Sequence, residues 1–249
     1  MNGTIIYPCG DSPALAYATK ELLARGICVT NDPSQTVTHV LLSVPSFVKG
    51  SVDPVHILSG LPKDVTVIGG NLSHPALQNY RQIDLLQDAQ YLAQNAAITA
   101  DCALRIAGNQ LPVVFENCPI LIIGWGRIGK CLAKKLKALG ADICVAARKE
   151  TDRATLCALG YRAEDPSTLQ HCLMRYRVIF NTAPDAVLTK SQPLYCRPAC
   201  VKSDLASIQG ISGSDVIHAR GLPGKQTPES SGILIANTII RLLRKEDTP

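Results

Sequence analysis

One stretch constrains the fold of this chain more than any other, and it reads PILIIGWGRIGKCLAKKLKALGADICVAARK over residues 119–149. An apolar run ends at a glycine, two more glycines complete the spacing GxGxxG, and a helical pattern of leucines begins at once. Glycine serves three purposes there: a tight turn off the strand, close approach of the backbone to a pyrophosphate, and close packing of the helix on the sheet. We therefore predict a dinucleotide-binding strand, turn and helix. The candidate phosphate-binding residues are Gly124, Gly126, Arg127, Ile128 and Gly129.

The end of the second predicted strand indicates which dinucleotide binds. NAD-binding units usually place Asp or Glu there to hold the ribose hydroxyls, whereas this chain has Ala146 and Ala147 followed by Arg148 and Lys149. A carboxylate would repel a 2′-phosphate, and an arginine would bind one. The sequence therefore favours NADP(H) over NAD(H). The alternative is that Arg148 and Lys149 are merely a solvated strand end.

Composition and charge exclude several functions. The net charge of +5 is spread along the chain, and aromatic residues make up only 4%, so we do not expect a nucleic-acid partner. No apolar run reaches the length of a membrane span, and residues 1–12 lack the pattern of a signal peptide, so we expect a cytoplasmic protein with no membrane partner. The mild positive balance suits anionic ligands such as a phosphorylated cofactor and a carboxylate substrate.

Ten cysteines are scattered along the chain without CxxC spacing. Several fall at apolar strand or helix positions, where a thiol behaves as a small hydrophobe, so we expect reduced cysteines in the core. Cys196 and Cys200 could be combined with His218 as metal ligands, but this set lacks a second closely spaced pair. We therefore expect no metal site.

Strands alternate with helices before the glycine-rich stretch, which predicts a parallel sheet covered on both faces. The predicted strands are 4–7, 27–30, 39–44 and 66–68, and the predicted helices are 13–25 and 52–61. This part of the chain has no phosphate-binding glycine pattern. We interpret it as a substrate-side or packing lobe rather than a second cofactor site.

Residues 83–107 contain neither glycine nor proline and predict a long helix that links two lobes. Asn95 and Thr99 stand four residues apart, so an unbroken helix would place them on one face. Connecting helices of two-lobed dehydrogenases commonly line the cleft, which makes Asn95, Thr99 and Asp101 candidates for the substrate side. The alternative is a solvated or capping role for these polar residues.

The chain after residue 149 continues the alternation. Helices are predicted near 152–159 and 167–175, and strands over 178–180, 201–205 and 216–219. A polar loop that closes a Rossmann strand lies at the carboxyl edge of the sheet, where ligands bind. This loop supplies the candidate cofactor residues Asn181, Thr182, Ala183 and Pro184.

Two later features complete the candidate site. Asp204 lies near the end of the next strand, where it either faces the nicotinamide or caps the following turn. Residues 221–224 predict a turn, and Gly221 and Pro223 either lie beside the cofactor or belong to a simple connection. An apolar helix is predicted over 233–243.

These patterns together predict a two-lobed α/β fold with doubly wound parallel sheets. A C-terminal Rossmann NAD(P)-binding domain is expected over 111–228, and a smaller flavodoxin-like N-terminal lobe over 1–82. The linker helix is assigned to 83–110, and a C-terminal helix to 229–249.

The motifs, taken in order, resemble the A subunits of bacterial dipicolinate synthases. That family carries an N-A-x-x-T-A-E-like linker, a GFGRxG turn, a VAAR strand end, an NTxP loop, a DLAS strand and a GLPGxxAPxTAGxIIAN terminus. The counterparts here are residues 95–101, 124–129, 145–148, 181–184, 204–207 and 221–237. The chain departs from the family at Asp101, where Glu is usual, and after Ser207, where IQGISG replaces a KPGG-like turn.

The resemblance implies an NADP-dependent oxidoreductase that converts a dihydrodipicolinate-type precursor into dipicolinate during spore formation. It also implies a small dicarboxylate substrate and a partner that is a flavoprotein-like B subunit; whether the chain forms a homo-oligomer is left open. The candidate catalytic residues are Asn95, Thr99, Asp101 and Asp204.

Two other functions remain as alternatives. A D-2-hydroxyacid dehydrogenase would need a histidine paired with a carboxylate and an arginine, and the only histidine after Asp204 is His218, within a predicted strand. A non-catalytic NADPH-binding module would need none of these catalytic groups.

Overall fold

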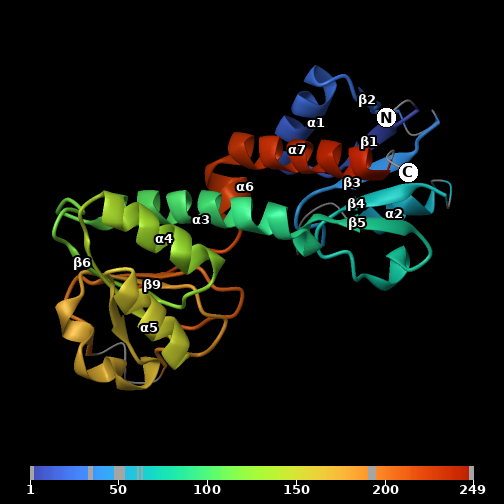
Figure 1. Ribbon diagram of the computed structural model, residues 1–249. Helices are drawn as coiled ribbons and strands as arrows, with labels where there is room; N and C mark the ends of the chain where they lie inside the picture. The colour runs from blue at the N-terminus through green and yellow to red at the C-terminus, as the bar shows by residue number, and fades with distance from the viewer. Residues whose placement is uncertain are drawn as a thin grey trace. The chain divides into compact units, whose positions relative to one another are not determined.

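The computed structural model of the chain describes residues 3–32, 36–47, 54–60, 62, 64–189 and 195–246. The chain divides into two compact units (Figure 1). The first unit combines residues 1–98 with residues 223–249, and the second contains residues 99–222. The first boundary falls inside the helix α3 (Ala89–Gln110), so the predicted linker helix is shared between the units.

The first unit contains a five-stranded parallel sheet. Its strands lie in the order β2-β1-β3-β4-β5. They are β1 (Ile5–Cys9), β2 (Cys28–Val29), β3 (His39–Leu42), β4 (Thr66–Gly69) and β5 (Arg81–Asp84). This order is that of flavodoxin-like folds, so the flavodoxin-like parallel sheet predicted for the N-terminal lobe is confirmed.

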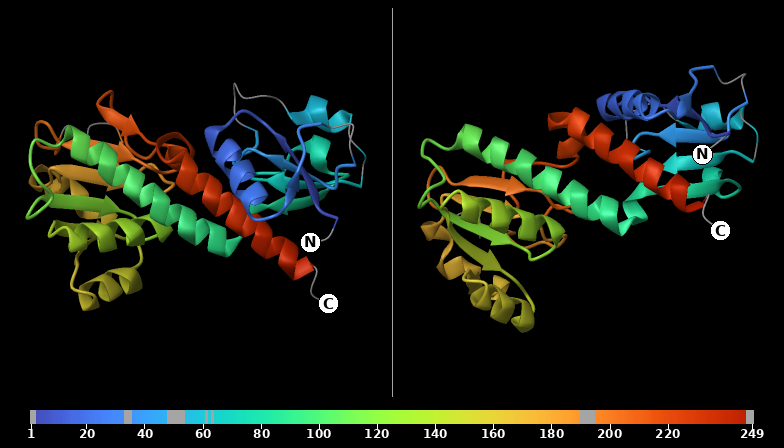
Figure 2. Two further views of the ribbon diagram at one scale, coloured as in Figure 1. Left: turned by 90° about the horizontal axis from the view of Figure 1, so that it is seen from above. Right: turned by 45° about the horizontal axis from the view of Figure 1, so that its top comes forward.

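Two helices from opposite ends of the sequence cover one face of this sheet. Helices α1 (Pro13–Ala24) and α7 (Pro228–Glu246) lie side by side (Figures 1 and 2). Ser12 caps α1 by accepting a hydrogen bond of 3.2 Å from the backbone N–H of Leu15. The helices approach closely because residue 232 is glycine: a Cβ atom there would lie 2.7 Å from the carbonyl oxygen of Ala14. Leucine, isoleucine and alanine side chains of α7 complete the apolar core on this face.

A second apolar cluster fills the opposite face. Alternate residues of β3 and β4, such as Val40, Leu42 and Val67, pack there with Leu58 of α2 (Pro54–Ser59) and Leu77 of the short helix η1 (Pro75–Leu77). Helix α2 occupies the centre of the helix predicted over 52–61, and the predicted positions 52, 53 and 61 lie outside the described residues.

The start of the predicted helix at residue 83 is wrong. Ile83 pairs with Ile68 as part of the edge strand β5, and a short turn, η2 (Leu85–Gln87), precedes α3. The carboxylate of Asp84 ends the strand by accepting hydrogen bonds from the backbone N–H groups of Leu72 and Leu86, at 3.0 and 2.9 Å. Asp88 then caps α3 through the N–H of Tyr91, at 2.7 Å. Two aspartates therefore divide a stretch that reads as one helix.

The second unit contains a six-stranded parallel sheet in the order β11-β10-β9-β6-β7-β8. The strands are β6 (Pro119–Ile123), β7 (Asp142–Ala146), β8 (Arg162–Glu164), β9 (Val178–Asn181), β10 (Val201–Asp204) and β11 (Val216–His218). The chain runs outward from β6 to β8, and then continues on the other side of β6 with β9. This is a Rossmann order, so the predicted fold class is confirmed.

Helices pack on both faces of the Rossmann sheet. Helix α4 (Arg127–Ala138) buries Leu132 and Leu136 and lies beside the second half of α3, where Lys135 of α4 forms an ion pair with Asp101 of α3 at 2.8 Å (Figure 1). The other face packs against the short helices η3 (Pro166–His171) and η4 (Leu173–Arg175).

Several local predictions in this part of the chain differ from the structure. The helix predicted over 167–175 is two 3₁₀ helices, because Asp165 starts one as N-cap and the chain pauses at Cys172 before the next. The turn predicted at 221–224 is wrong in part, since Leu222–Gln226 forms the short helix α6. Helix α7 begins at Pro228 rather than residue 233, with proline in its first turn.

Most cysteines are core residues, as the sequence predicts. Seven of the ten are buried, namely Cys9, Cys102, Cys118, Cys144, Cys172, Cys196 and Cys200. Within the described part of the chain, no helix is both long enough and apolar enough to span a bilayer.

Candidate functional site

The turn between β6 and α4 lies where the order of the Rossmann sheet reverses. Strand β6 is flanked by β7 and β9, and ligands of doubly wound sheets bind outside the carboxyl ends of the strands at such a point. A cavity of about 810 Å³ occupies this position, entirely within the second unit. The residues that line it are Ile123, Gly124, Trp125, Gly126, Ala146, Ala147, Arg148, Lys149, Asp152, Pro166, Ser167, Thr182, Ala183, Pro184, Asp185, Ala186, Val187 and Thr189.

The three glycines of the turn meet different requirements. Gly124 has a φ of +104°, and a Cβ atom there would lie 2.6 Å from Oγ1 of Thr182. A Cβ atom on Gly129 would lie 2.1 Å from the carbonyl oxygen of Gly124, so only glycine lets α4 start this close to the strand. A Cβ atom on Gly126 would meet nothing within 4 Å, which leaves open space above the turn.

The helix that follows the turn begins without a side-chain cap. Gly126 is its N-cap residue, and it has no side chain that could accept a hydrogen bond from the first-turn N–H groups. Together with the helix dipole, such groups favour an anion at this position. Open space above Gly126 and an uncapped helix start are the two features that a pyrophosphate requires, so the residues present fit a dinucleotide.

The loop after β9 is tied to the glycine turn. Thr182 donates its backbone N–H to the carbonyl oxygen of Ile123 at 2.8 Å, and its hydroxyl approaches the carbonyl oxygen of Gly124 at 3.3 Å. Thr182, Ala183 and Pro184 thus form the wall of the cavity on the β9 side.

Asn181 and Asp204 lie beneath this wall, with 0% and 2% of their surfaces exposed. Asn181 donates to the carboxylate of Asp204 at 2.9 Å and, through its side-chain oxygen, accepts from the N–H of Ala183 at 3.1 Å. Asp204 also accepts from the N–H groups of Ala206, Gly210 and Ile211, at 3.2, 2.7 and 3.0 Å. Because protein donors engage both carboxylate oxygens, these contacts favour the capping alternative for Asp204.

Basic residues lie at the end of β7, as the sequence suggests. Arg148 and Lys149 line the cavity, and Arg148 forms an ion pair of 2.8 Å with Asp185. The side chains of Arg148 and Asp185 are 77% and 49% exposed. Asp185 belongs to the loop after β9, so this ion pair joins segments that follow the two neighbours of β6.

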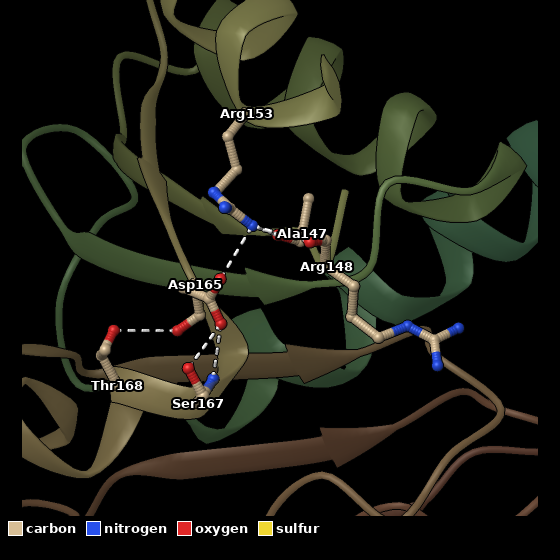
Figure 3. Close-up of polar contacts among 6 residues, drawn as sticks. All are labelled: Ala147, Arg148, Arg153, Asp165, Ser167 and Thr168. Atoms are coloured by element: carbon tan, nitrogen blue, oxygen red, sulfur yellow. Dashed lines mark hydrogen bonds and ion pairs between the residues drawn. The ribbon is translucent and has the colours of Figure 1, made fainter. Parts of the chain in front are cut away.

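Arg153 holds the segments at this end of the cavity together (Figure 3). Its Nη1 donates to the carbonyl oxygens of Ala147 and Arg148, at 2.7 and 2.8 Å, and forms an ion pair of 2.9 Å with Asp165. The carboxylate of Asp165 also accepts from the N–H and the hydroxyl of Ser167, at 2.9 and 2.7 Å. These hydrogen bonds from Ser167, followed by the charge of Arg153, lower the pKa of Asp165.

The single tryptophan of the chain also lines the cavity. The ring of Trp125 meets that of Tyr161 edge to face, with 5.9 Å between centroids, and Nζ of Lys130 lies 5.7 Å from the Trp125 ring. Trp125 therefore offers an intrinsic fluorescence signal for ligand binding.

The remaining predicted residues lie away from the cavity lining. Arg127, Ile128 and Gly129 form the first turn of α4, Gly221 follows β11, and Pro223 belongs to the first unit. On the unbroken helix α3, Asn95 and Thr99 share one face, and Thr99 is 7% exposed. Asp101 lies about 200° further around the helix than Thr99. His218, the histidine of the dehydrogenase alternative, is exposed at the end of the edge strand β11.

Reasoning from the sequence did not single out Asp185, Arg153, Asp165 or Ser167. Arg153 and Asp165 are a helix residue and a loop residue of common types, and no spacing connects them. The one available signal is the position of each shortly after a predicted strand or at its end, since the carboxyl ends of parallel strands meet at one edge.

Comparison with known proteins supports this interpretation. A family model described as "NADP oxidoreductase coenzyme F420-dependent" matches residues 119–190. The dipicolinate synthase A subunit of Bacillus subtilis (strain 168) is 24% identical over 191 residues, which cover 71% of this chain. The match spans 64% of that relative's length.

Solved structures share the fold across nearly the whole chain. The crystal structure of the dipicolinate synthase A subunit from Bacillus halodurans has a TM-score of 0.83 at 20% identity, covering 97% of this chain and 98% of that one. A transhydrogenase from Sinorhizobium meliloti has a TM-score of 0.76 at 14% identity, covering 97% and 94%. The resemblance to dipicolinate synthase A subunits is thus confirmed, and the fold is that of NAD(P)-dependent oxidoreductases.

Proposed function

We propose that this chain is an NADP-dependent oxidoreductase that oxidises a dihydrodipicolinate-type precursor to dipicolinate. The observation that carries the proposal is the cavity at the switch point of the Rossmann sheet, which combines an uncapped helix start at Gly126 with Arg148 and Lys149 at the end of β7. The similarity to the dipicolinate synthase A subunit supports the substrate class.

The protein would hold the cofactor through groups of known position. N–H groups at the start of α4 would receive the pyrophosphate above Gly126. Arg148 would bind the 2′-phosphate, for which its guanidinium is suited by charge and geometry. The loop of Thr182, Ala183 and Pro184 would border the nicotinamide end, and Asn181 and Asp204 would support that loop from below.

Two carboxylates complicate a preference based on charge alone. Asp152 and Asp185 also line the cavity. Asp185 is paired with Arg148, and Asp152 lies in the first turn of α5 (Glu150–Ala158), where the helix dipole favours an acid. Neither stands at the end of β7, where NAD-binding units place the acid that holds the ribose.

The reaction needs little covalent chemistry from the protein. When bound, NADP supplies the acceptor for a hydride. The ring becomes aromatic as the hydride and one proton leave, so the protein has to position the donor carbon, bind two carboxylates and release the proton. We assign Asn95 and Thr99 to the substrate side because they share one face of α3. Asp101 is a weaker candidate, since its carboxylate is paired with Lys135.

The similarity also supports three further parts of the same proposal, namely a role in spore formation, a cytoplasmic location and a partner B subunit. A homo-oligomer remains an alternative assembly.

The deciding experiment follows NADP reduction on enzymatically generated dihydrodipicolinate precursor, with and without a B subunit. We expect absorbance at the reduced-nicotinamide band to rise with NADP and much less with NAD. Thr99→Val should lower the rate while cofactor affinity stays unchanged, and Lys135→Met, which frees Asp101, serves as a matched control on the neighbouring helix. Absence of reduction in both arms would refute the proposal. NADPH binding without turnover would then favour a binding module, and oxidation of simple 2-hydroxy acids would favour a D-2-hydroxyacid dehydrogenase.

A further inference from the structure

The side chain of Arg153 joins three segments around one end of the cavity without lining it. It projects from the first half of α5 and is only 25% exposed. Its Nη1 contacts two carbonyl oxygens of the turn after β7 and the carboxylate of Asp165, which follows β8. Figure 3 shows the guanidinium pointing at Ala147 and Asp165, whereas the side chain of Arg148 extends away from this group.

The segments that Arg153 joins carry the cavity lining at this end. Arg148 lines the cavity on one side, and Ser167 lines it on another. The position of Ser167 depends on Asp165, which accepts hydrogen bonds from both its N–H and its hydroxyl. Thr168 adds a hydrogen bond of 3.0 Å from its hydroxyl to the carbonyl oxygen of Asp165. Arg153 is therefore the shared anchor of both walls.

We propose that Arg153 is a positioning residue for the 2′-phosphate of the cofactor. By fixing the carbonyls of Ala147 and Arg148, it holds the backbone from which the Arg148 side chain reaches the cavity. By binding Asp165, it also fixes the wall that carries Ser167. Arg153 thus sets the preference for NADP over NAD through other residues, and this inference rests on the proposed NADP-dependent function.

Arginine suits this role better than lysine. A planar guanidinium presents its donors in a fixed fork, so one side chain can engage carbonyl oxygens and a carboxylate in defined directions. A lysine ammonium has a single nitrogen on a flexible stem, so it would not fix the same three oxygens as rigidly. Because those oxygens occupy Nη1 of Arg153, phosphate binding is left to Arg148.

The test compares dissociation constants for NADP and NAD, measured by calorimetry and by Trp125 fluorescence. The variants are Arg153→Ala and Arg153→Lys. The matched control is Arg162→Ala, which breaks an Arg–Asp ion pair of 2.8 Å with Asp142 at the amino ends of β7 and β8. We expect Arg153→Ala to weaken NADP about tenfold and NAD less than about twofold, with Arg153→Lys intermediate and the control unchanged.

The outcomes separate this inference from the proposed function. Equal weakening of NADP and NAD by Arg153→Ala, or no weakening, would overturn the positioning role. If Arg153→Ala does not fold, Asp165→Asn removes one arm of the anchor, and it should weaken NADP selectively by about threefold. A wild-type protein that prefers NADP, and loses the preference in Arg148→Ala but not in the Arg153 variants, would contradict this inference alone. A wild-type protein that binds both cofactors equally would contradict the proposed function as well.

Discussion

The hydroxyl of Thr182 donates a hydrogen bond of 3.0 Å to the carbonyl oxygen of Ile123, the last residue of β6. The loop after β9 is therefore bound to the residue that precedes the glycine turn. Any change in this contact alters the relative position of two walls of the cavity.

We expect Thr182→Val to destabilise the protein by about 1 kcal/mol, because a methyl group cannot replace the hydroxyl donor beside two carbonyl oxygens. NADP affinity should fall with it, since the loop that lines the cavity loses its attachment. Thermal unfolding and cofactor titration measure both effects. Thr182→Ser keeps the hydroxyl and should stay close to wild type; a serine variant as weak as the valine variant would argue against this contact.

The second and third glycines of the turn should respond differently to alanine. Gly129→Ala places a Cβ atom against the carbonyl oxygen of Gly124, and we expect a loss of about 3 kcal/mol in stability. Gly126→Ala meets open space, so its stability should change by less than about 1 kcal/mol, the scale of an altered N-cap. NADP affinity should nevertheless fall at least about tenfold in Gly126→Ala, because the methyl group occupies the place of the pyrophosphate.

Urea unfolding and cofactor titration of both alanine variants test this contrast. The idea fails if Gly126→Ala binds NADP as tightly as the wild type does.

Asp185 competes with a phosphate for Arg148. Both side chains are largely exposed, so their ion pair is worth little and the effect should be small. We expect Asp185→Asn to bind NADP about two- to fivefold more tightly at low salt and NAD with unchanged affinity. The difference between the variant and the wild type should shrink as salt screens the pair. Titrations at two ionic strengths check this prediction, and a parallel gain for NAD would contradict it.

The first unit contains a charge pair whose effect depends on pH. Asp88 accepts hydrogen bonds from Arg241 of α7, at 2.6 Å, and from the N–H of Tyr91. The hydrogen bond from Arg241 is the main cause that lowers the pKa of Asp88 below its ordinary 3.8. The ionised form is thus preferred in the folded protein. Its contribution to stability is complete above the unfolded pKa and disappears as pH falls through the lower folded pKa.

Asp88→Asn should therefore cost about 1.5 kcal/mol at pH 7, and the cost should vanish once the pH lies below the folded pKa. Asparagine still caps a helix, so the substitution isolates the charge. Urea unfolding at pH 7 and at decreasing acidic pH values measures the difference. A cost that stays constant down to the lowest pH would show that the charge is not responsible.

The parts of the fold that were predictable from the sequence are those with local signals. The glycine spacing and the apolar run of β6 identify the turn, because each glycine answers a short-range steric demand. Strands β5 and β8 gave no such signal. They are short edge strands, RQID and RAE, and no residue of either is buried, so no apolar pattern marks them.

The candidate site was predictable only where it follows a strand end. Arg148 and Thr182 were found in this way, whereas the pairs Arg148–Asp185 and Arg153–Asp165 join residues 37 and 12 positions apart. Such contacts depend on the sheet order and on side-chain directions, which no motif specifies. Asp204 shows the same limit, because its carboxylate could have faced either a ligand or the turn that it caps.

Helix α7 packs into the first unit, although the chain reaches it only after completing the second. During synthesis on the ribosome, residues 99–222 are therefore available to fold before the segment that begins the chain can bury its apolar face. The nascent N-terminal sheet has to wait for Leu234, Ile235 and Ile239, which emerge long after β5. Chaperone dependence, and any truncation that removes the last helix, should consequently affect the first unit and leave the cofactor-binding unit able to form.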